Sequence, residues 1–146
     1  MCIRDRGYPD RESEIAMLDD RGTTDPLTTL QPVADAATVR ALVTAVQGLH
    51  VSDAIRRYVV ALVEATRRSP DLRLGASPRA GLQLLRTARA SAALAGRDHV
   101  LPDDVQAMAV PVLAHRVLLS PDAALARRDA ERVIADLVTA VPVLRH

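Results

Sequence analysis

Apolar residues recur along most of the chain three and four positions apart, which is the spacing of one face of an α-helix. Residues that favour helix starts, such as Ser52, Pro102 and Asp129, precede these runs, and Gly48 and Gly96 follow two of them. The pattern predicts helices over residues 10–20, 35–48, 52–68, 77–96 and 102–113, and a last helix from residue 129 onward.

The segments between these helices are expected to be short, apart from a loop at residues 22–34 that is longer than usual. Brief extended links are expected at residues 50–51 and 98–101, a turn at 69–71, a short strand at 117–119 and a loop at 121–127. Pro111 should kink its helix. The predicted fold is all-α, a compact bundle of about six short helices with very short extended links.

The composition favours closely packed helices. The chain is 49% apolar, contains no Phe or Trp and has only two Tyr among its 146 residues. Small aliphatic side chains therefore have to fill the core. The helix from residue 77 is expected to turn one such face inward, made of Leu82, Leu85, Ala88, Ala92 and Ala95.

The start of that helix holds a cation in an unfavourable place. The Ser77 hydroxyl can cap the helix and Pro78 suits its first position, which puts Arg79 in the first turn. The positive end of the helix dipole disfavours a cation there. Arg79 is therefore expected to extend into solvent, to bind an anion, or to pair with an acid such as Asp71 or Asp98.

The charged and metal-binding residue types exclude several functions. All 19 basic residues are Arg, so no lysine is available for a Schiff base or for a phosphate-binding loop, and the net charge of +1 gives no case for nucleic acid. His50 and His99 are expected to make structural hydrogen bonds, and Asp103 and Asp104 fit the helix dipole, so no metal site is predicted. The single cysteine fits a cytoplasmic protein, and no run is long and apolar enough for a membrane span.

Several motifs occur in an order that resembles the C-terminal lid of the MoxR-type AAA+ ATPases. The resemblance covers about residues 7–143, and each motif is weak alone. The motifs are Gly-Tyr-Pro-Asp-Arg-Glu at 7–12, His-Val-Ser-Asp at 50–53, Ala-Thr-Arg at 65–67, Gly-Ala-Ser-Pro-Arg-Ala at 75–80, Gly-Arg-Asp-His-Val-Leu-Pro-Asp-Asp-Val at 96–105, Leu-Ala-His-Arg at 113–116 and Ala-Val-Pro-Val at 140–143.

The resemblance implies that residues 35–146 form the helical lid, with residues 7–34 as its first helix and connecting loop. It also implies that Arg79 is the sensor-2 residue that reaches the phosphates of ATP, with Tyr8 and Pro9 near the adenine. The family forms rings, usually hexamers, and remodels client proteins as a chaperone-like ATPase, often beside proteins with a von Willebrand A domain. The implied partners are a missing ATPase core and ring neighbours, with no nucleic acid and no membrane.

The sequence departs from the family's pattern before residue 7. The segments that bind ATP and Mg²⁺ precede the Gly-Tyr-Pro motif in the family, whereas residues 1–6 match none of them and are expected to be a non-native leader. The chain alone should therefore be inactive and bind ATP poorly, while the full-length parent would be the ATPase. The alternatives are a free-standing helical adaptor, a histone-fold-like nucleic-acid-binding module, or a helical packing domain.

Overall fold

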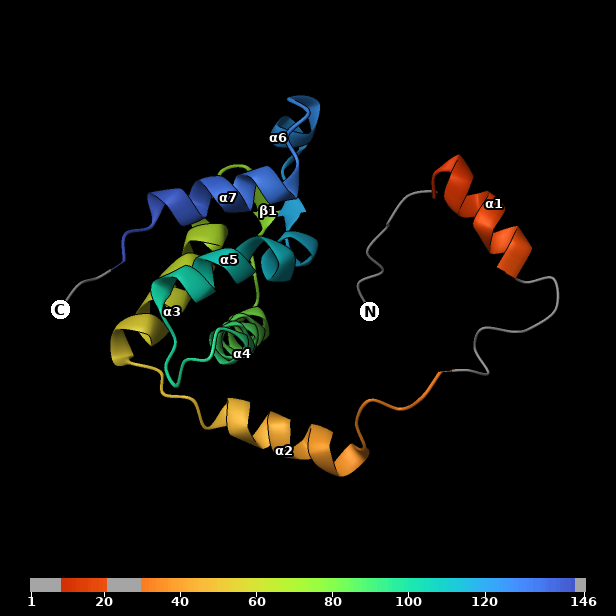
Figure 1. Cartoon of the computed structure of the whole chain (residues 1–146). Helices are drawn as coiled ribbons and strands as arrows, with labels where there is room; N and C mark the ends of the chain where they lie inside the picture. Colours follow the sequence, from red (N-terminus) through yellow and green to blue (C-terminus); the bar gives the residue numbers. More distant parts are fainter. Residues whose placement is uncertain (1–8, 21–29, 144–146) are drawn as a thin grey trace. The chain divides into compact units, whose positions relative to one another are not determined.

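The computed structural model describes residues 9–20 and 30–143, and its contacts divide the chain into two units, Met1–Val39 and Arg40–His146 (Figure 1). Each unit is described by itself. The expected leader at residues 1–6, Tyr8 and most of the loop at 22–34 lie outside the described residues.

Local side-chain caps start the first two helices. Helix α1 (Arg11–Asp20) follows Asp10, whose carboxylate accepts a hydrogen bond from the Ser13 N–H at 2.8 Å, and this bond lowers the pKa of Asp10. Asp35 caps helix α2 (Ala36–Gln47) in the same way through the Thr38 N–H at 2.7 Å. Both helices agree with the sequence pattern. None of the residues of α2 is buried, however, so its apolar face is not part of the core.

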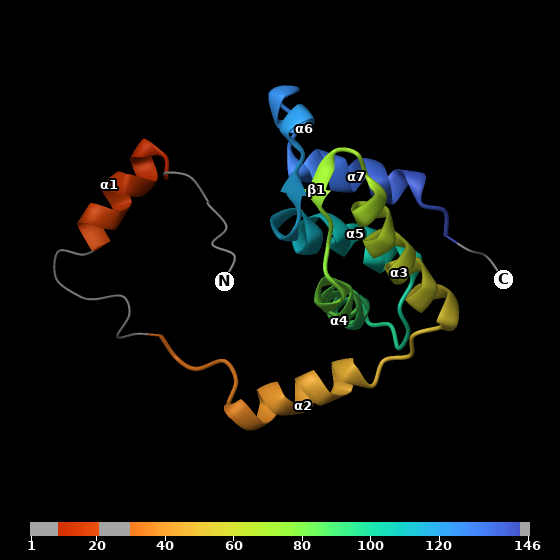
Figure 2. The same ribbon diagram turned by 180° about the vertical axis from the view of Figure 1, so that it is seen from behind.

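The second unit is a helical bundle, which confirms the predicted all-α fold. Its main helices are α3 (Asp53–Arg68), α4 (Pro78–Leu94), α5 (Pro102–Leu113) and α7 (Ala130–Ala140). Helix α5 contacts the other three, and α4 and α7 lie on opposite sides of it (Figures 1 and 2). Among the described residues, no helix has the length and apolar character needed to cross a membrane.

Small side chains let the helices approach closely. Ala80, Ala88 and Ala92 of α4 are fully buried. Tyr58 of α3 is the largest side chain of this core, with 1% of its surface exposed, and its hydroxyl accepts a hydrogen bond from the Gln106 amide at 3.3 Å. A core made of closely spaced helices therefore needs few large residues, as the composition indicates.

The predicted inward face of α4 was wrong in part. Leu84 is fully buried, because the inward residues repeat every four positions from Ala80, whereas Leu82 is 61% exposed. Leu82 and Leu85 instead line an apolar groove of about 270 Å³ between α3 and α4. Ala95 is exposed, since it lies beyond the last residue of the helix.

Two short strands and an extra short helix complete the bundle. Strand β1 (Leu72–Leu74), which the sequence pattern did not predict, pairs antiparallel with β2 (Leu118–Leu119), which lies in the expected strand. Helix α5 runs through Pro111 to Leu113, and a 3-10 turn, η2 (Ala114–Arg116), follows it directly. The expected loop at 121–127 was wrong, because it contains helix α6 (Pro121–Leu125), which the Ser120 hydroxyl caps through the Ala123 N–H at 3.3 Å.

The link between α4 and α5 is held by a buried carboxylate. Asp104, 3% exposed, accepts hydrogen bonds from both terminal nitrogens of Arg97 at 2.7 and 2.6 Å, and from the Leu101 N–H at 2.8 Å. The Arg97 guanidinium lowers the pKa of Asp104 to about 2. The helix dipole, which the sequence offered as the reason for this acid, is therefore only part of its role.

The backbones of His50 and His99 pair with each other in an isolated parallel bridge. The His50 N–H donates to the Asp98 carbonyl at 3.0 Å, and the His50 carbonyl accepts from the Val100 N–H at 3.1 Å. The backbone of His50 thus joins the two links, while the ring of His99 lies 2.8 Å from the Asp98 carboxylate; these hydrogen bonds are in line with the structural role expected from the sequence.

Candidate functional site

Arg79 lies in the first turn of α4, with its side chain exposed to solvent. The expected pairing with Asp71 or Asp98 does not occur, because Asp71 binds Arg128 at 2.7 Å and Asp98 binds His99 at 2.8 Å. Within residues 9–20 and 30–143, the Arg79 side chain makes no hydrogen bond or ion pair. Its guanidinium is thus available to an external anion.

The N–H groups in the first turn of α4 are not capped by the Ser77 side chain and are therefore also available to an anion. Ser77 has the extended backbone of a helix cap, with φ −77° and ψ 162°, but its hydroxyl caps no N–H group of α4, contrary to the sequence-based expectation. Its carbonyl accepts the Ala80 N–H at 2.9 Å. The positive end of the helix dipole therefore lies beside the Arg79 side chain without a side-chain acceptor, an environment that favours an anion.

The connection that enters α4 is bound to the last turn of α3. The Thr66 hydroxyl accepts a hydrogen bond from the Ala76 N–H at 2.8 Å and donates one to the Val63 carbonyl at 2.6 Å. The Nε of Arg67 donates to the Ala76 carbonyl at 2.9 Å. Both polar groups of the Ala76 backbone are therefore held by side chains from α3.

Gly75 lets this connection lie against α3. A Cβ atom added at Gly75 would stand 2.7 Å from both the Cα and the backbone nitrogen of Arg67. Real Cβ atoms do not come this close to backbone atoms, so any other residue would push the connection away. Gly75 thus permits the two hydrogen bonds that Thr66 and Arg67 make to Ala76.

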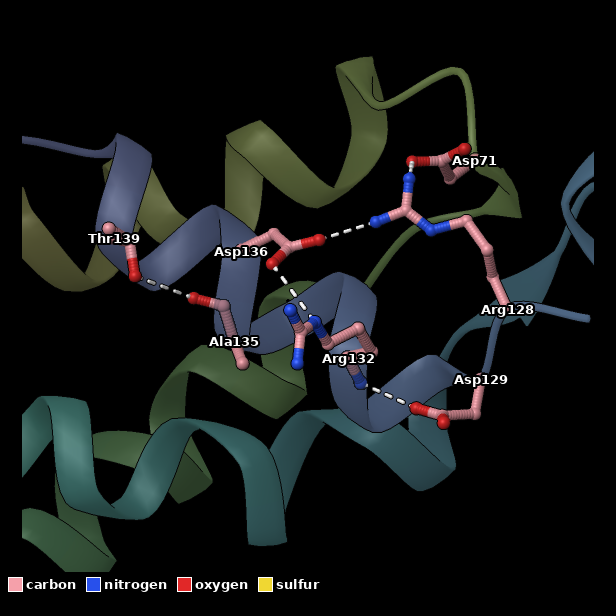
Figure 3. Close-up of polar contacts among 7 residues, drawn as sticks. All are labelled: Asp71, Arg128, Asp129, Arg132, Ala135, Asp136 and Thr139. Atoms are coloured by element: carbon pink, nitrogen blue, oxygen red, sulfur yellow. Dashed lines mark hydrogen bonds and ion pairs between the residues drawn. The ribbon is translucent and has the colours of Figure 1, made fainter.

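The other end of the same connection is held by an ion-pair network (Figure 3). One terminal nitrogen of Arg128 binds the Asp71 carboxylate at 2.7 Å and the other binds Asp136 of α7. The Asp71 carbonyl also accepts the Ser120 N–H at 2.8 Å. The segment between α3 and α4 is therefore fastened near both of its ends.

Sequence reasoning located Arg79 but gave no role in the site to Thr66 or Gly75, and it took Arg67 for part of a solvated face at the end of its helix. A signal was present, because Ala-Thr-Arg at 65–67 and Gly-Ala-Ser-Pro-Arg at 75–79 are short motifs near a helix end and a helix start. Of the other predicted site residues, Pro9 is exposed just before α1 in the first unit, and Tyr8 lies outside the described residues.

The described residues fit a phosphate better than a metal ion. Arg79 can make charge-assisted hydrogen bonds to phosphate oxygens. Among the described residues, no three or more His, Cys, Asp or Glu side chains form a group that could hold a metal ion. The exposed guanidinium of Arg79 can therefore contact the phosphates of a nucleotide.

Comparison with known families matches residues 64–137 to the model of the AAA lid domain. This range contains α4 and both motifs that fix its start, and it spans half of the chain. The chain belongs to the AAA lid domain family. Its relatives place this lid among the MoxR-type AAA+ ATPases, as the motifs indicated.

These relatives are longer than this chain. It is 36% identical over 137 residues to "Uncharacterized protein YeaC" of Bacillus subtilis, a match that covers 94% of this chain and 43% of YeaC. It is 34% identical over 137 residues to "Chaperone MoxR1" of Mycobacterium tuberculosis, covering 88% of this chain and 36% of MoxR1. The lid therefore spans less than half the length of these relatives.

A crystal structure shows the same fold. The structure of a "putative ATPase" from Cytophaga hutchinsonii matches with a TM-score of 0.82 at 25% identity, over 95% of this chain and 45% of that protein. The lid thus occurs there within a longer polypeptide.

Proposed function

We propose that the chain is the nucleotide-sensing lid of a MoxR-type AAA+ ATPase and that Arg79 contacts the phosphates of ATP. The observation that carries this proposal is the exposed side chain of Arg79, which is unpaired among the described residues. The backbone of Ala76, three residues before it, is by contrast held by hydrogen bonds from Thr66 and Arg67.

A guanidinium suits this role because it can bind two phosphate oxygens at once and stays charged at every physiological pH. Its bonds to a γ-phosphate would be lost when hydrolysis releases that group. The lid would then change its position relative to the ATPase core and pass the change to neighbouring subunits. Nucleotide state would in this way become movement of a rigid helical unit.

The rest of the machinery would come from the full-length parent. Its ATPase core would bind ATP and Mg²⁺, with Tyr8 and Pro9 near the adenine, and ring neighbours would complete the assembly. The name of MoxR1 supports a chaperone-like action on client proteins, and von Willebrand A domain proteins are the proposed partners. We place this assembly in the cytoplasm.

The test is the Arg79→Ala substitution in the full-length parent. Removing a group that stabilises transition-state charge should lower ATP turnover roughly a hundredfold. The exposed position of Arg79 should leave the helical content and melting temperature unchanged. Arg79→Lys should recover only part of the activity, because an ammonium group cannot make the same paired contact.

Arg86→Ala is the matched control, since Arg86 is an exposed arginine two helical turns further along α4. Its turnover should stay close to that of the unmodified parent. Unchanged turnover in Arg79→Ala would refute the sensing role. An equal loss in both variants would show that α4 needs positive charge in general and not Arg79 in particular.

A further inference from the structure

We propose that Thr66 is a positioning residue for Arg79: its hydroxyl fixes where the connection from α3 enters α4, and so where the guanidinium is presented. This inference rests on the proposed sensing role of Arg79. It adds that the precision of the phosphate contact depends on a side chain of the preceding helix, which need not touch the nucleotide.

The Thr66 hydroxyl both donates and accepts a hydrogen bond within the protein. It donates its only proton to the Val63 carbonyl at 2.6 Å and accepts the Ala76 N–H at 2.8 Å, and the residue is 1% exposed. Because water has little access, the Ala76 N–H can find another partner only if the connection moves. The bond from Thr66 therefore selects one position of this backbone.

That position is transmitted to Arg79 over a short and stiff path. Arg79 is three residues after Ala76, and the two residues between them are Ser77, which is extended, and Pro78, whose ring fixes its φ angle. A displacement at Ala76 therefore moves the start of α4 and has little flexible chain in which to be absorbed. The hydrogen bond from Arg67 to the Ala76 carbonyl restrains the position of the same backbone.

The test compares Thr66→Val with Thr66→Ser in the full-length parent. Valine keeps the shape of threonine and removes both hydrogen bonds, whereas serine keeps the hydroxyl. Thr66→Val should lower kcat for ATP hydrolysis at least about tenfold, because a misplacement near 1 Å is enough for such a loss. Thr66→Ser should recover most of it. Equal activity of the valine variant and the unmodified parent would overturn the inference.

Thr87→Val is the control for the chemical change itself. The Thr87 hydroxyl is part-buried and donates to the Gln83 and Leu84 carbonyls at 3.0 and 2.9 Å, all within α4, and it holds no connecting segment. Its valine variant should keep normal turnover. If Thr87→Val lowers turnover as much as Thr66→Val does, the loss results from removing any buried hydroxyl, and the inference is overturned.

A second variant perturbs the same contact without removing a hydrogen-bonding group. The Cβ of Gly75→Ala would meet the Arg67 backbone at 2.7 Å and push the connection away, and turnover should again fall about tenfold or more. Gly48→Ala is its control, since an added Cβ there has its nearest contact at 3.4 Å. This pair keeps the inference testable if Thr66→Val does not fold. Normal turnover in Gly75→Ala would count against it.

The double variant Thr66→Val with Arg79→Ala separates this inference from the proposed function. If Thr66 acts through Arg79, the valine substitution should lower kcat no further once the arginine is gone. A further tenfold loss would show a role independent of Arg79. If Arg79→Ala alone has no effect, the sensing role itself fails; if only Thr66→Val and Gly75→Ala have none, the positioning role fails alone.

Discussion

Asp104 is a buried carboxylate in the first turn of α5. Two bonds from Arg97, one from the Ser91 hydroxyl at 3.1 Å and one from the Leu101 N–H all favour its charged form. These hydrogen bonds, those from Arg97 above all, stabilise the charged carboxylate and lower its pKa to about 2. It thereby fixes the geometry of the turn that joins α4 to α5.

Because the pKa of Asp104 is lower in the folded chain than its ordinary value of 3.8, its contribution to stability is complete above pH 4 and is lost as the pH falls toward 2. Asp104→Asn should lower the free energy of unfolding by about 2 kcal/mol at pH 7. Urea denaturation at several pH values measures this, and the difference from the unmodified chain should shrink below pH 4.

Asp103→Asn is the appropriate control, as Asp103 is its exposed neighbour in the same helical turn. It should change the free energy of unfolding by less than about 0.5 kcal/mol. A pH-independent difference for Asp104→Asn would contradict the assignment of the stability to its charge.

Arg79 shows what the sequence can predict at this scale. Its place in the first turn of a helix followed from its neighbours Ser77 and Pro78, which are local signals. That its side chain has no partner among the described residues did not follow, because Asp71 binds Arg128, which is 57 positions away. Pairings over such distances depend on how the helices pack, and a single sequence does not reveal them.

At the scale of the element, α4 carries two apolar faces with different roles. The inward face contains Leu84, which is fully buried, whereas Leu82 lies at the exposed groove beside α3. Periodicity predicted the helix correctly but placed Leu82 on the inward face. Leu82 and Leu84 each fall in a row of apolar residues with helical spacing, so the spacing alone does not tell which row is buried. Which row is buried depends on how α4 packs against both α5 and α3, which periodicity does not reveal.

Leu84→Ala should therefore destabilise the bundle by about 3 kcal/mol, as expected for a cavity in a closely packed core. Leu82→Ala should reduce the free energy of unfolding by less than about 1 kcal/mol, because its side chain is already largely in solvent. Thermal or urea denaturation of the two variants checks the assignment. Similar losses in both would indicate that α4 is rotated from the position described.

Most helix boundaries were predictable because their signals are local. Ser52 and Asp129 both accept N–H groups at the starts of α3 and α7, as their types suggest. The five-residue helix α6 was missed because it is too short for periodicity to show. Strand β1 was missed because its partner β2 comes more than 40 positions later.

At the scale of the whole bundle, Arg128 links segments that are far apart in the sequence. Its guanidinium joins Asp71, just before β1, to Asp136 of α7 (Figure 3). All three side chains are partly exposed, so the network is weaker than a buried pair would be. The network connects the segment that leads to α4 with the last helix, α7.

Arg128→Ala should lower the free energy of unfolding by about 1 kcal/mol, and 1 M NaCl should reduce this difference because salt screens partly exposed charges. Hydrogen exchange should also become faster for the Ser120 N–H, which binds the Asp71 carbonyl. Arg132→Ala is the control, since Arg132 is 73% exposed and only reaches Asp136 at 3.5 Å. Equal losses in the two variants would remove any special role of Arg128.

Tyr58 gives the bundle its own optical reporter. The chain has no tryptophan, and Tyr58 is one of its two tyrosines. Its ring is enclosed by the core, and its hydroxyl is held by Gln106 of α5. In a Tyr8→Phe background, ultraviolet absorbance and tyrosine emission would come from this single ring. Separation of α3 from α5 could then be followed spectroscopically without attaching a dye to the protein.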